Sequence, residues 1–367
     1  MKANRLRISN FRNIESADIE FSPSVNIFCG NNGQGKTNLL EALWMFTGAK
    51  SFRGAKNAEM IRFGEKTADI ILDFNSHGRD QNAIMKIRAD TRMVTLNDVD
   101  DLVPGNLIGS MCAIVFAPEH VKLVTGGAEG RRAFIDCSIC QMKPSFTNTV
   151  VRYTKVLRQR NALLKQIKEN TAEGSLLSIW DDHLSQLGAH IAVTRYRYLQ
   201  QLSEKASAIY NGISDGREVF DAKYACSFFR HAGDCEEDYQ YMLLKKLQEG
   251  RGSDLTLGFT YYGPHRDDID IRLDSMPVRQ FGSQGQKRSC VLALKLGEAE
   301  MMSSTAGEMP VAILDDVLSE LDTSRQKFLL SKLDGWQVMI TCCDKDSLKK
   351  VTKGKIFEVE NGIFTAH

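Results

Sequence analysis

The sequence predicts an α/β protein in which a mixed sheet carries an inserted, mainly helical lobe. Residues 25–46 have the pattern of a short apolar strand, a glycine-rich loop and a helix, and residues 310–316 form a second apolar run that ends in acids. Between these two segments, alternating strand patterns give way to long stretches with helical spacing. We therefore expect a head made of residues 1–118 and 255–367, interrupted by a helical insert at 119–254.

The N-terminal part of the chain predicts short strands separated by polar turns. Alternating and apolar runs favour strands at 3–8, 17–21, 25–29, 67–74, 83–88, 93–96 and 111–116. Segment 9–13 is expected to be a polar turn, and segment 75–81 a hairpin loop. The last of these strands ends before Pro118, because proline cannot continue a ladder of backbone hydrogen bonds.

The middle and C-terminal parts predict first helices and then an alternation of helix and strand. Stretches with few turn residues predict helices at 131–143, 147–170 and 176–211, then a strand at 218–229 and a helix at 236–248. From Thr256 the chain returns to a strand pattern and is expected to rejoin the N-terminal sheet. The elements predicted there are strands at 269–273, 310–314 and 337–340 and a helix at 289–302.

The composition favours a globular protein and gives no sign of a membrane protein. With 367 residues, 43% hydrophobic and 25% charged, the chain has the balance of a globular protein with a sizeable core. No apolar run approaches the ~20 residues that span a bilayer, and the N-terminus begins directly with a strand pattern, so a cytoplasmic protein without membrane partners is expected. The net charge of +1 means that any DNA contact must come from a local basic patch.

The nine cysteines are expected to be reduced thiols and not ligands of a metal. Cys137 and Cys140 form one C-x-x-C pair, without a second pair or histidines at zinc spacing. Cys342 and Cys343 are adjacent in the chain, a spacing that disfavours a disulfide between them.

Residues 30–37 match the pattern G-x-x-x-x-G-K-[ST], the phosphate-binding loop of P-loop NTPases. The glycines let backbone N–H groups turn towards phosphate oxygens, and the N-terminus of the following helix adds partial positive charge. Lys36 is expected to reach the β- and γ-phosphates of ATP, and the Thr37 hydroxyl to bind Mg²⁺. The expected nucleotide-binding residues are Gly30, Asn31, Asn32, Gly33, Gln34, Gly35, Lys36 and Thr37.

The strand at 310–314 ends in two acids that are expected to serve the same nucleotide. The carboxyl end of a buried parallel strand faces the ligand in open α/β sheets. Asp315 is expected to hold Mg²⁺, directly or through water, and Asp316 to orient or deprotonate the attacking water. With Lys36, these acids are the predicted catalytic residues. The alternative, in which the two acids cap the next helix, needs no ligand.

A second phosphate-binding turn is predicted at 283–287, before the helix at 289–302. A Ser-x-Gly-Gln turn that opens a helix presents a hydroxyl, bare N–H groups and a helix dipole. One γ-phosphate does not need two such sites from one chain. We therefore expect a homodimer in which Ser283, Gly285 and Gln286 close over ATP bound to the partner's loop.

Four features have two interpretations each. Arg12 and Asn13 lie either near the nucleotide or in ordinary turn chemistry, and Asp322 belongs either to the dimer contact of 319–322 or to a helix cap. Thr341 is either a sensor of the γ-phosphate or the end of a strand. The fourth feature is a basic set in one helix, either a DNA-contacting stripe or a solvated face, formed by Arg152, Lys155, Arg158, Arg160, Lys165 and Lys168.

Taken together, these motifs resemble the bacterial RecF family of ABC-type ATPases, which is related to SMC proteins. The resemblance covers essentially the whole chain, and the combination of 263–268 with 283–287 is its most family-specific part. The matching segments are 9–13, 30–42, 116–119, 130–136, 159–161, 263–268, 283–287 and 314–322. His120 and Ala128 depart from the family pattern, which usually has an acid and a proline at these positions.

The resemblance implies a weak, DNA-linked ATPase that acts as a conformational switch. It implies ATP-dependent dimerisation, slow hydrolysis that releases DNA, and a role in recombinational repair and replication restart during the response to DNA damage. Implied partners are duplex DNA and single-strand gaps, RecR and RecO directly, and RecA indirectly. Two other classes remain possible: the ATPase subunit of a transporter, which membrane copurification would favour, and a monomeric P-loop kinase, which product phosphorylation would reveal.

Overall fold

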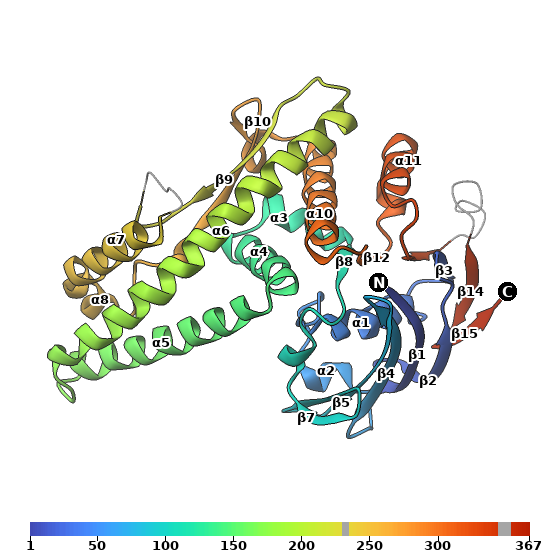
Figure 1. Ribbon diagram of the computed structural model, residues 1–367, viewed down its shortest axis with the longest axis horizontal. Helices are drawn as coiled ribbons and strands as arrows, with labels where there is room; N and C mark the ends of the chain where they lie inside the picture. The colour runs from blue at the N-terminus through green and yellow to red at the C-terminus, as the bar shows by residue number, and fades with distance from the viewer. Residues whose placement is uncertain (230–234, 344–353) are drawn as a thin grey trace. The chain divides into compact units, whose positions relative to one another are not determined.

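The computed structural model of the protein describes residues 1–229, 235–343 and 354–367. Contacts within the chain define two compact units (Figure 1). The head unit comprises residues 1–120 and 295–367, and the helical unit comprises residues 121–294. The helical unit thus extends beyond the predicted insert, which was expected to end at 254.

One sheet of the head unit is antiparallel, in the order β2-β1-β4-β5-β6-β7. The central strand β4 alternates between fully and partly buried residues, as a sheet with one covered face requires. The antiparallel group expected at 67–96 is confirmed, but β1 extends through the buried Phe11, so the expected turn at 9–13 is reduced to Arg12 and Asn13. The strands are β1 (Lys2–Phe11), β2 (Ile14–Glu20), β4 (Ala68–Ser76), β5 (Arg79–Ile87), β6 (Arg92–Leu96) and β7 (Val99–Leu102).

The second sheet of the head unit has the order β15-β14-β3-β13-β12-β8. In the described part of this sheet, β8, β12, β13, β3 and β14 pair with one another in parallel, and β15 pairs antiparallel with β14. Because parallel strands end at one edge, the residues after β3, β12 and β13 meet there. The strands are β3 (Val25–Cys29), β8 (Ala113–Phe116), β12 (Val311–Leu314), β13 (Val338–Cys342), β14 (Lys355–Glu360) and β15 (Ile363–Ala366).

Few helices lie entirely within the described ranges of the head unit. They are α1 (Lys36–Trp44), α2 (Asn57–Met60) and α11 (Thr323–Lys332), with 3-10 turns η1 (Met45–Thr47), η2 (Pro104–Leu107), η3 (Pro118–Val121) and η6 (Leu318–Glu320). Helix α10 (Gln284–Ala306) crosses the division between the two units along the chain.

The helical unit is built on long helices and a three-stranded sheet of order β11-β10-β9. Its helices are α3 (Lys122–Thr125), α4 (Ala128–Met142), α5 (Ser145–Lys168), α6 (Leu177–Ser214), α7 (Glu236–Glu249), α8 (Arg251–Leu257) and α9 (Val278–Phe281), with turns η4 (Gly174–Leu176) and η5 (Pro264–Arg266). Its strands are β9 (Phe220–Ala225), β10 (Asp268–Leu273) and β11 (Met276–Pro277).

The expectation that the chain rejoins the head sheet from Thr256 is wrong. Thr256 lies in α8, and β10 pairs with β9 and β11 over its whole length. The first strand after the insert that joins the parallel sheet is β12. A strand pattern reports alternating burial, which is the same in either sheet, and so does not identify the pairing partner.

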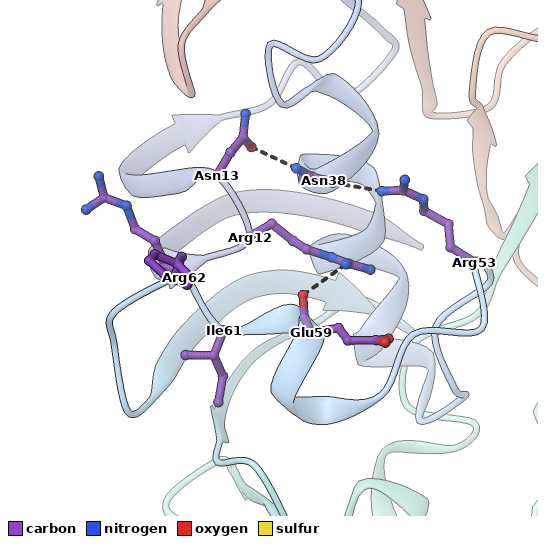
Figure 2. A pocket seen from close by; sticks show the side chains of 8 residues that line it. Arg12, Asn13, Asn38, Arg53, Glu59, Ile61 and Arg62 are labelled. Carbon is purple, nitrogen blue, oxygen red and sulfur yellow. Dashed lines mark hydrogen bonds between the residues drawn. The ribbon is translucent and has the colours of Figure 1, made fainter.

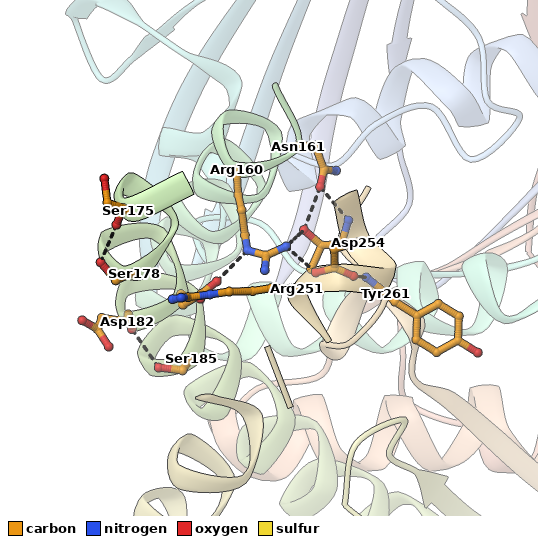
Figure 3. Close-up of polar contacts among 11 residues, drawn as sticks. Arg160, Asn161, Ser175, Ser178, Asp182, Ser185, Arg251, Asp254 and Tyr261 are labelled. Atoms are coloured by element: carbon orange, nitrogen blue, oxygen red, sulfur yellow. Dashed lines mark hydrogen bonds and ion pairs between the residues drawn. The ribbon is translucent and has the colours of Figure 1, made fainter. Parts of the chain in front are cut away.

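A buried ion network ties three helices of the helical unit together (Figure 3). The Arg160 guanidinium on α5 is fully buried and donates to Asp181 on α6 (2.7 Å), Asp254 on α8 (2.6 Å) and Thr260 (2.8 Å). Arg251 donates to the second oxygen of Asp181 (2.9 Å). Arg160 therefore does not belong to a DNA-contacting stripe, and this part of the prediction is wrong. The other five cations of the set are exposed.

Candidate functional site

The glycine-rich loop connects β3 to α1 in the head unit. Gly30 has no space for a side chain, since a Cβ atom there would lie 2.2 Å from a carbonyl oxygen of β14. Gly35 has a φ of +113°, which residues with a Cβ atom rarely adopt. The Lys36 ammonium folds back over the loop and donates to the carbonyl oxygens of Gly30 (2.5 Å) and Asn31 (2.9 Å). The buried Lys36 ammonium is thus enclosed by the backbone of the loop.

Asp315 joins this loop to the neighbouring strand. Its Oδ1 atom accepts hydrogen bonds from the hydroxyls of Thr37 (2.8 Å), at the start of α1, and Thr341 (2.9 Å), in β13. Burial raises the pKa of the Asp315 carboxyl, and the hydrogen bonds from Thr37 and Thr341 oppose that rise. A carboxylate and a hydroxyl side by side are the hard oxygen ligands that suit Mg²⁺, so these residues fit the metal that the loop motif implies.

Thr341 also makes a hydrogen bond to the second acid, Asp316. The backbone N–H of Asp316 donates to Thr341 Oγ1 (2.8 Å). Asp316 has a φ of +51°, and Ser319 Oγ donates to both its carbonyl oxygen (2.7 Å) and its Oδ1 atom (3.1 Å). The 2%-exposed Thr341 is therefore bonded to both acids, which neither of its two sequence-based interpretations anticipated.

A cavity of about 200 Å³ lies at this edge of the sheet. It is lined by residues 32–38 together with Arg53, Asp316 and Thr341. The cavity brings together the loop, one of the two acids and the threonine that links them. Arg53 is a residue that the sequence did not single out, because the segment around it has no helix or strand pattern and no motif.

A larger hollow of about 800 Å³ shares Asn38 and Arg53 with this cavity (Figure 2). Hydrogen bonds run from Asn38 to Asn13 (2.7 Å) and from Arg53 to Asn38 (2.9 Å), and Asn13 donates to the Gly33 carbonyl oxygen of the loop (3.1 Å). Asn13 therefore contacts the loop directly. Phe63, at the rim, is completely exposed, and no sequence pattern marked it.

Arg12 has the turn geometry of one of its two interpretations, and a position near the nucleotide stays a prediction. It has a φ of +55°, as a tight turn requires, and it lines the larger hollow. Its guanidinium makes a two-point contact with the fully buried Glu41 of α1 (2.9 and 3.0 Å) and donates to the Glu59 carbonyl oxygen (2.9 Å). Arg12 thus fixes α1, and with it the loop, against the first antiparallel strand.

Comparison with known proteins identifies the family. The model described as RecF/RecN/SMC N terminal domain matches residues 2–365. The DNA replication and repair protein RecF of Acetivibrio thermocellus is 36% identical over 347 residues, covering 94% of each chain. RecF of Clostridioides difficile is 35% identical over 365 residues, covering 99% of this chain and 97% of its own. This chain belongs to the RecF family.

Solved structures agree with the RecF assignment. A structure of the recombination mediator protein RecF-ATP in the RecFOR pathway has a TM-score of 0.94 at 32% identity and covers 100% of this chain and 97% of that one. The Smc head domain of Pyrococcus furiosus, bound to a domain of ScpA, has a TM-score of 0.56 at 15% identity, which shows the shared ATPase-head fold alone.

Within the ranges that the structure describes, no helix is both long and apolar enough to cross a bilayer.

The second turn of the RecF pattern forms a helix cap in the helical unit. Helix α10 begins at Gln284, and Ser283 precedes it. The Gln286 N–H donates to Ser283 Oγ (3.2 Å), while the Ser283 N–H donates to Gln286 Oε1 (2.7 Å), which makes a reciprocal capping box. Two N–H groups that were expected to be bare are therefore engaged. Among the described residues, the Ser283 hydroxyl proton and the N–H groups of Gln284 and Gly285 have no acceptor, as is usual for the first turn of a helix.

Two other RecF segments, far apart in sequence, lie against each other. Arg131 makes a two-point ion pair with Asp268 (2.6 and 2.8 Å), and Arg132 donates to the Asp267 carbonyl oxygen (2.7 Å). The buried Asp267 carboxylate in turn accepts hydrogen bonds from the Tyr224 hydroxyl and the Ser227 N–H. Segment 263–268, one half of the most family-specific combination, therefore makes contacts within the helical unit.

The two departures from the RecF pattern have local explanations. His120 Nδ1 accepts the Ala117 N–H (3.3 Å) and so closes the turn after β8. Burial, together with the charge of Lys295, lowers the pKa of His120 to about 3, so the residue is neutral at pH 7. Ala128 is the first residue of α4, where a proline is tolerated and not required.

The structure divides the predicted site residues between the two units. Residues 30–37 with Asp315 and Asp316 lie in the head unit, whereas Ser283, Gly285 and Gln286 lie in the helical unit. The Gln34 side chain is directed at the β14–β15 turn, where it accepts the Asn361 N–H (2.6 Å). Asp322 caps α11 by accepting the Arg325 N–H (2.9 Å), so the helix-cap interpretation is confirmed and a dimer role stays a prediction.

Replacing Thr341 by valine should slow ATP hydrolysis and destabilise the protein. Valine keeps the shape but leaves the partly buried Asp316 N–H without the Thr341 hydroxyl as acceptor, at a cost of about 1–3 kcal/mol in the free energy of unfolding. Urea denaturation and steady-state ATPase assays measure the two effects. Thr365→Val, at an exposed threonine of β15, is the matched control. Equal stability of the Thr341 and Thr365 variants would show that the link between the acids has no energetic weight.

Proposed function

We propose that this chain is an ATPase of DNA replication and repair that uses ATP as a conformational switch. The observation that carries the proposal is the position of Asp315, hydrogen-bonded to Thr37 and Thr341 beside the 200 Å³ cavity. A buried ammonium, a hydroxyl, a carboxylate and a helix N-terminus converge there. This set of groups is suited to the β- and γ-phosphates of ATP.

Each residue has a separate task in this proposal. The loop N–H groups bind the phosphates, and Lys36 exchanges the carbonyls of Gly30 and Asn31 for β- and γ-phosphate oxygens. Thr37 and Asp315 hold Mg²⁺, which neutralises charge on the phosphates when bound. Asp316 orients the attacking water. Because Thr341 holds its backbone and Ser319 its carboxylate, Asp316 is positioned before ATP arrives.

The larger hollow is proposed to receive the nucleoside. It opens beside the phosphate cavity, with Asn38 and Arg53 common to both. The exposed ring of Phe63 offers a stacking surface for a base, and stacking tolerates any base because every base has a π-face. Arg53 lies at the junction of the two cavities, where its charge would face the phosphates.

Dimerisation and DNA binding complete the proposed cycle. ATP on one copy would be closed by the Ser283 turn of a second copy, and slow hydrolysis would release the pair and its DNA. The exposed cations Arg152, Lys155, Arg158, Lys165 and Lys168 of α5 offer a phosphate-contacting surface. By analogy with the recombination mediator RecF of the RecFOR pathway, the proposed partners are RecR and RecO, with RecA as the protein finally loaded.

The two alternative classes are not favoured. The two relatives compared above, which match over 94% and 99% of this chain, are DNA replication and repair proteins. A monomeric kinase also gives no task to a second turn whose hydroxyl and N–H groups are left for a ligand.

The Lys36→Ala variant tests the proposed ATP site. Each hydrogen bond from a charged group contributes about 1.5–3 kcal/mol, so losing two should weaken ATP binding at least ~100-fold. Isothermal titration calorimetry with ATP and Mg²⁺ measures this, with the exposed Lys66→Ala as the matched control. A Lys36→Ala affinity within about threefold of the control would place the nucleotide elsewhere.

A further inference from the structure

The Gln286 side chain has a second contact that explains its orientation in the capping box. While its Oε1 atom accepts the Ser283 N–H, its Nε2 atom donates to Glu218 Oε1 at 2.5 Å. A carboxylate only accepts hydrogen bonds, so Glu218 requires the NH₂ side of the amide to face it. The carbonyl side must then face Ser283. Glu218 thus sets the orientation of the amide that holds the turn.

Glu218 is itself held from several directions. It lies in the short connection between α6 and β9, and its Oε2 atom accepts the Tyr210 hydroxyl (2.6 Å). Tyr210, near the C-terminus of α6, is 1% exposed and stacks on Phe220 with ring centroids 5.7 Å apart. The backbone beside Glu218 is tied to the β10–β11 turn, because Val219 and Asp274 exchange two hydrogen bonds of 2.9 Å.

We propose that Glu218 is a positioning residue for ATP hydrolysis, which sets the Ser283–Gln286 turn and ties it through Tyr210 to α6. The inference rests on the proposed function, in which this turn completes the ATP site of a second copy. Glu218 does not touch ATP in this scheme. It keeps the Ser283 hydroxyl and the N–H groups of Gln284 and Gly285 in one arrangement, so that they meet the phosphates without reorganisation.

The three variants Gln286→Glu, Glu218→Gln and the double variant test this proposal. Glutamate caps a helix at this position as well as glutamine does, so Gln286→Glu alters the contact with Glu218 without removing the capping box. The two carboxylates would repel each other, and we expect ATP hydrolysis to fall about tenfold or more, since small displacements at a catalytic site have effects of this size. Glu218→Gln alone retains an acceptor and should stay within about threefold of the wild type.

The double variant gives the decisive result. With the donor and the acceptor exchanged, hydrolysis should return to within about threefold of the wild type, a coupling that distant, independent residues do not show. The affinity of one copy for ATP should be the same in all variants, because the P-loop is untouched. Asp215→Asn, an exposed acid in the same connection, is the control and should match the wild type. Normal hydrolysis by Gln286→Glu, no recovery in the double variant, or a parallel loss of ATP affinity would overturn the proposal.

A second measurement separates this inference from the dimer proposal. Amide hydrogen exchange at Ser283 and Gln286, recorded with ADP, should be faster in Gln286→Glu and return to the wild-type rate in the double variant. If the wild-type protein never dimerises with ATP, the dimer proposal fails, while this exchange pattern still reports on the turn. Unchanged exchange in Gln286→Glu would overturn the positioning role even if dimerisation is normal.

Discussion

Replacing Ser283 by arginine should leave ATP binding intact and abolish both ATP-dependent dimerisation and hydrolysis. Ser283 is exposed and caps α10, and its hydroxyl is one of the groups left for a ligand. Arginine adds a long cation at the point where the phosphates of a second copy would approach, and it removes a cap worth about 1 kcal/mol. The P-loop lies in the other unit of the chain, so the affinity of one copy for ATP should not change.

Light scattering decides this prediction. The wild-type mass should double when ADP is replaced by ATP under non-hydrolysing conditions, and the Ser283→Arg mass should stay that of a monomer. Ser304→Arg places the same residue at an exposed site near the other end of α10 and should behave as the wild type. A Ser283→Arg protein that dimerises normally would disprove the composite site.

Replacing Arg160 by methionine should produce the largest loss of stability in the helical unit. Methionine fills a similar volume but leaves Asp254 without its cationic partner and Asp181 with Arg251 alone. Removing one partner of a buried ion pair costs about 3–5 kcal/mol, because the remaining charges stay buried and uncompensated. The free energy of unfolding from guanidinium titrations should fall by this amount, and circular dichroism would follow the loss of helix.

Arg158→Met is the matched control for this change. Arg158 lies two residues away on α5 and is exposed, so its loss should alter stability by no more than about 0.5 kcal/mol. If the Arg160 and Arg158 variants were equally stable, the buried ion network would make no measurable contribution to the stability of the helical unit. The same contrast shows how DNA binding should be tested: charge reversal at Lys155 and Arg158 examines the surface of α5, whereas reversal at Arg160 would unfold it.

The spacing of residues in α5 predicts that Arg160 is buried, although its charge suggested an exposed position. Tyr153, Arg160 and Leu164 are all buried on α5 and recur at i, i+7 and i+11, which is one face of a helix. Grouping Arg160 with its charged neighbours ignored this spacing. Its acidic partners come from other helices, 21 and 94 residues further along the chain, so only the tertiary structure identifies them.

The Glu218 contact shows the opposite case, in which no local signal exists. Ser283 and Gln286 form an S-x-x-Q capping pattern that is readable in sequence. Glu218 lies 68 residues earlier, in a short connection between a helix and a strand, where an acid is ordinary. Nothing in the spacing of the chain relates the two positions.

The sequence by itself determined the strand–loop–helix unit at 25–46, the two acids after β12 and the family of the chain. These features depend on residue type at fixed spacing, since glycines, a lysine and a threonine must follow one another to form such a loop. The tertiary structure alone decided that Thr341 holds both acids, that Arg12 fixes α1 and that β10 belongs to a separate sheet. Thr37 and Asp315 are 278 residues apart, and their contact exists only because β3, β13 and β12 are neighbours that end at one edge. Strand order depends on long-range packing, and local patterns of burial are the same for every order that covers the same faces.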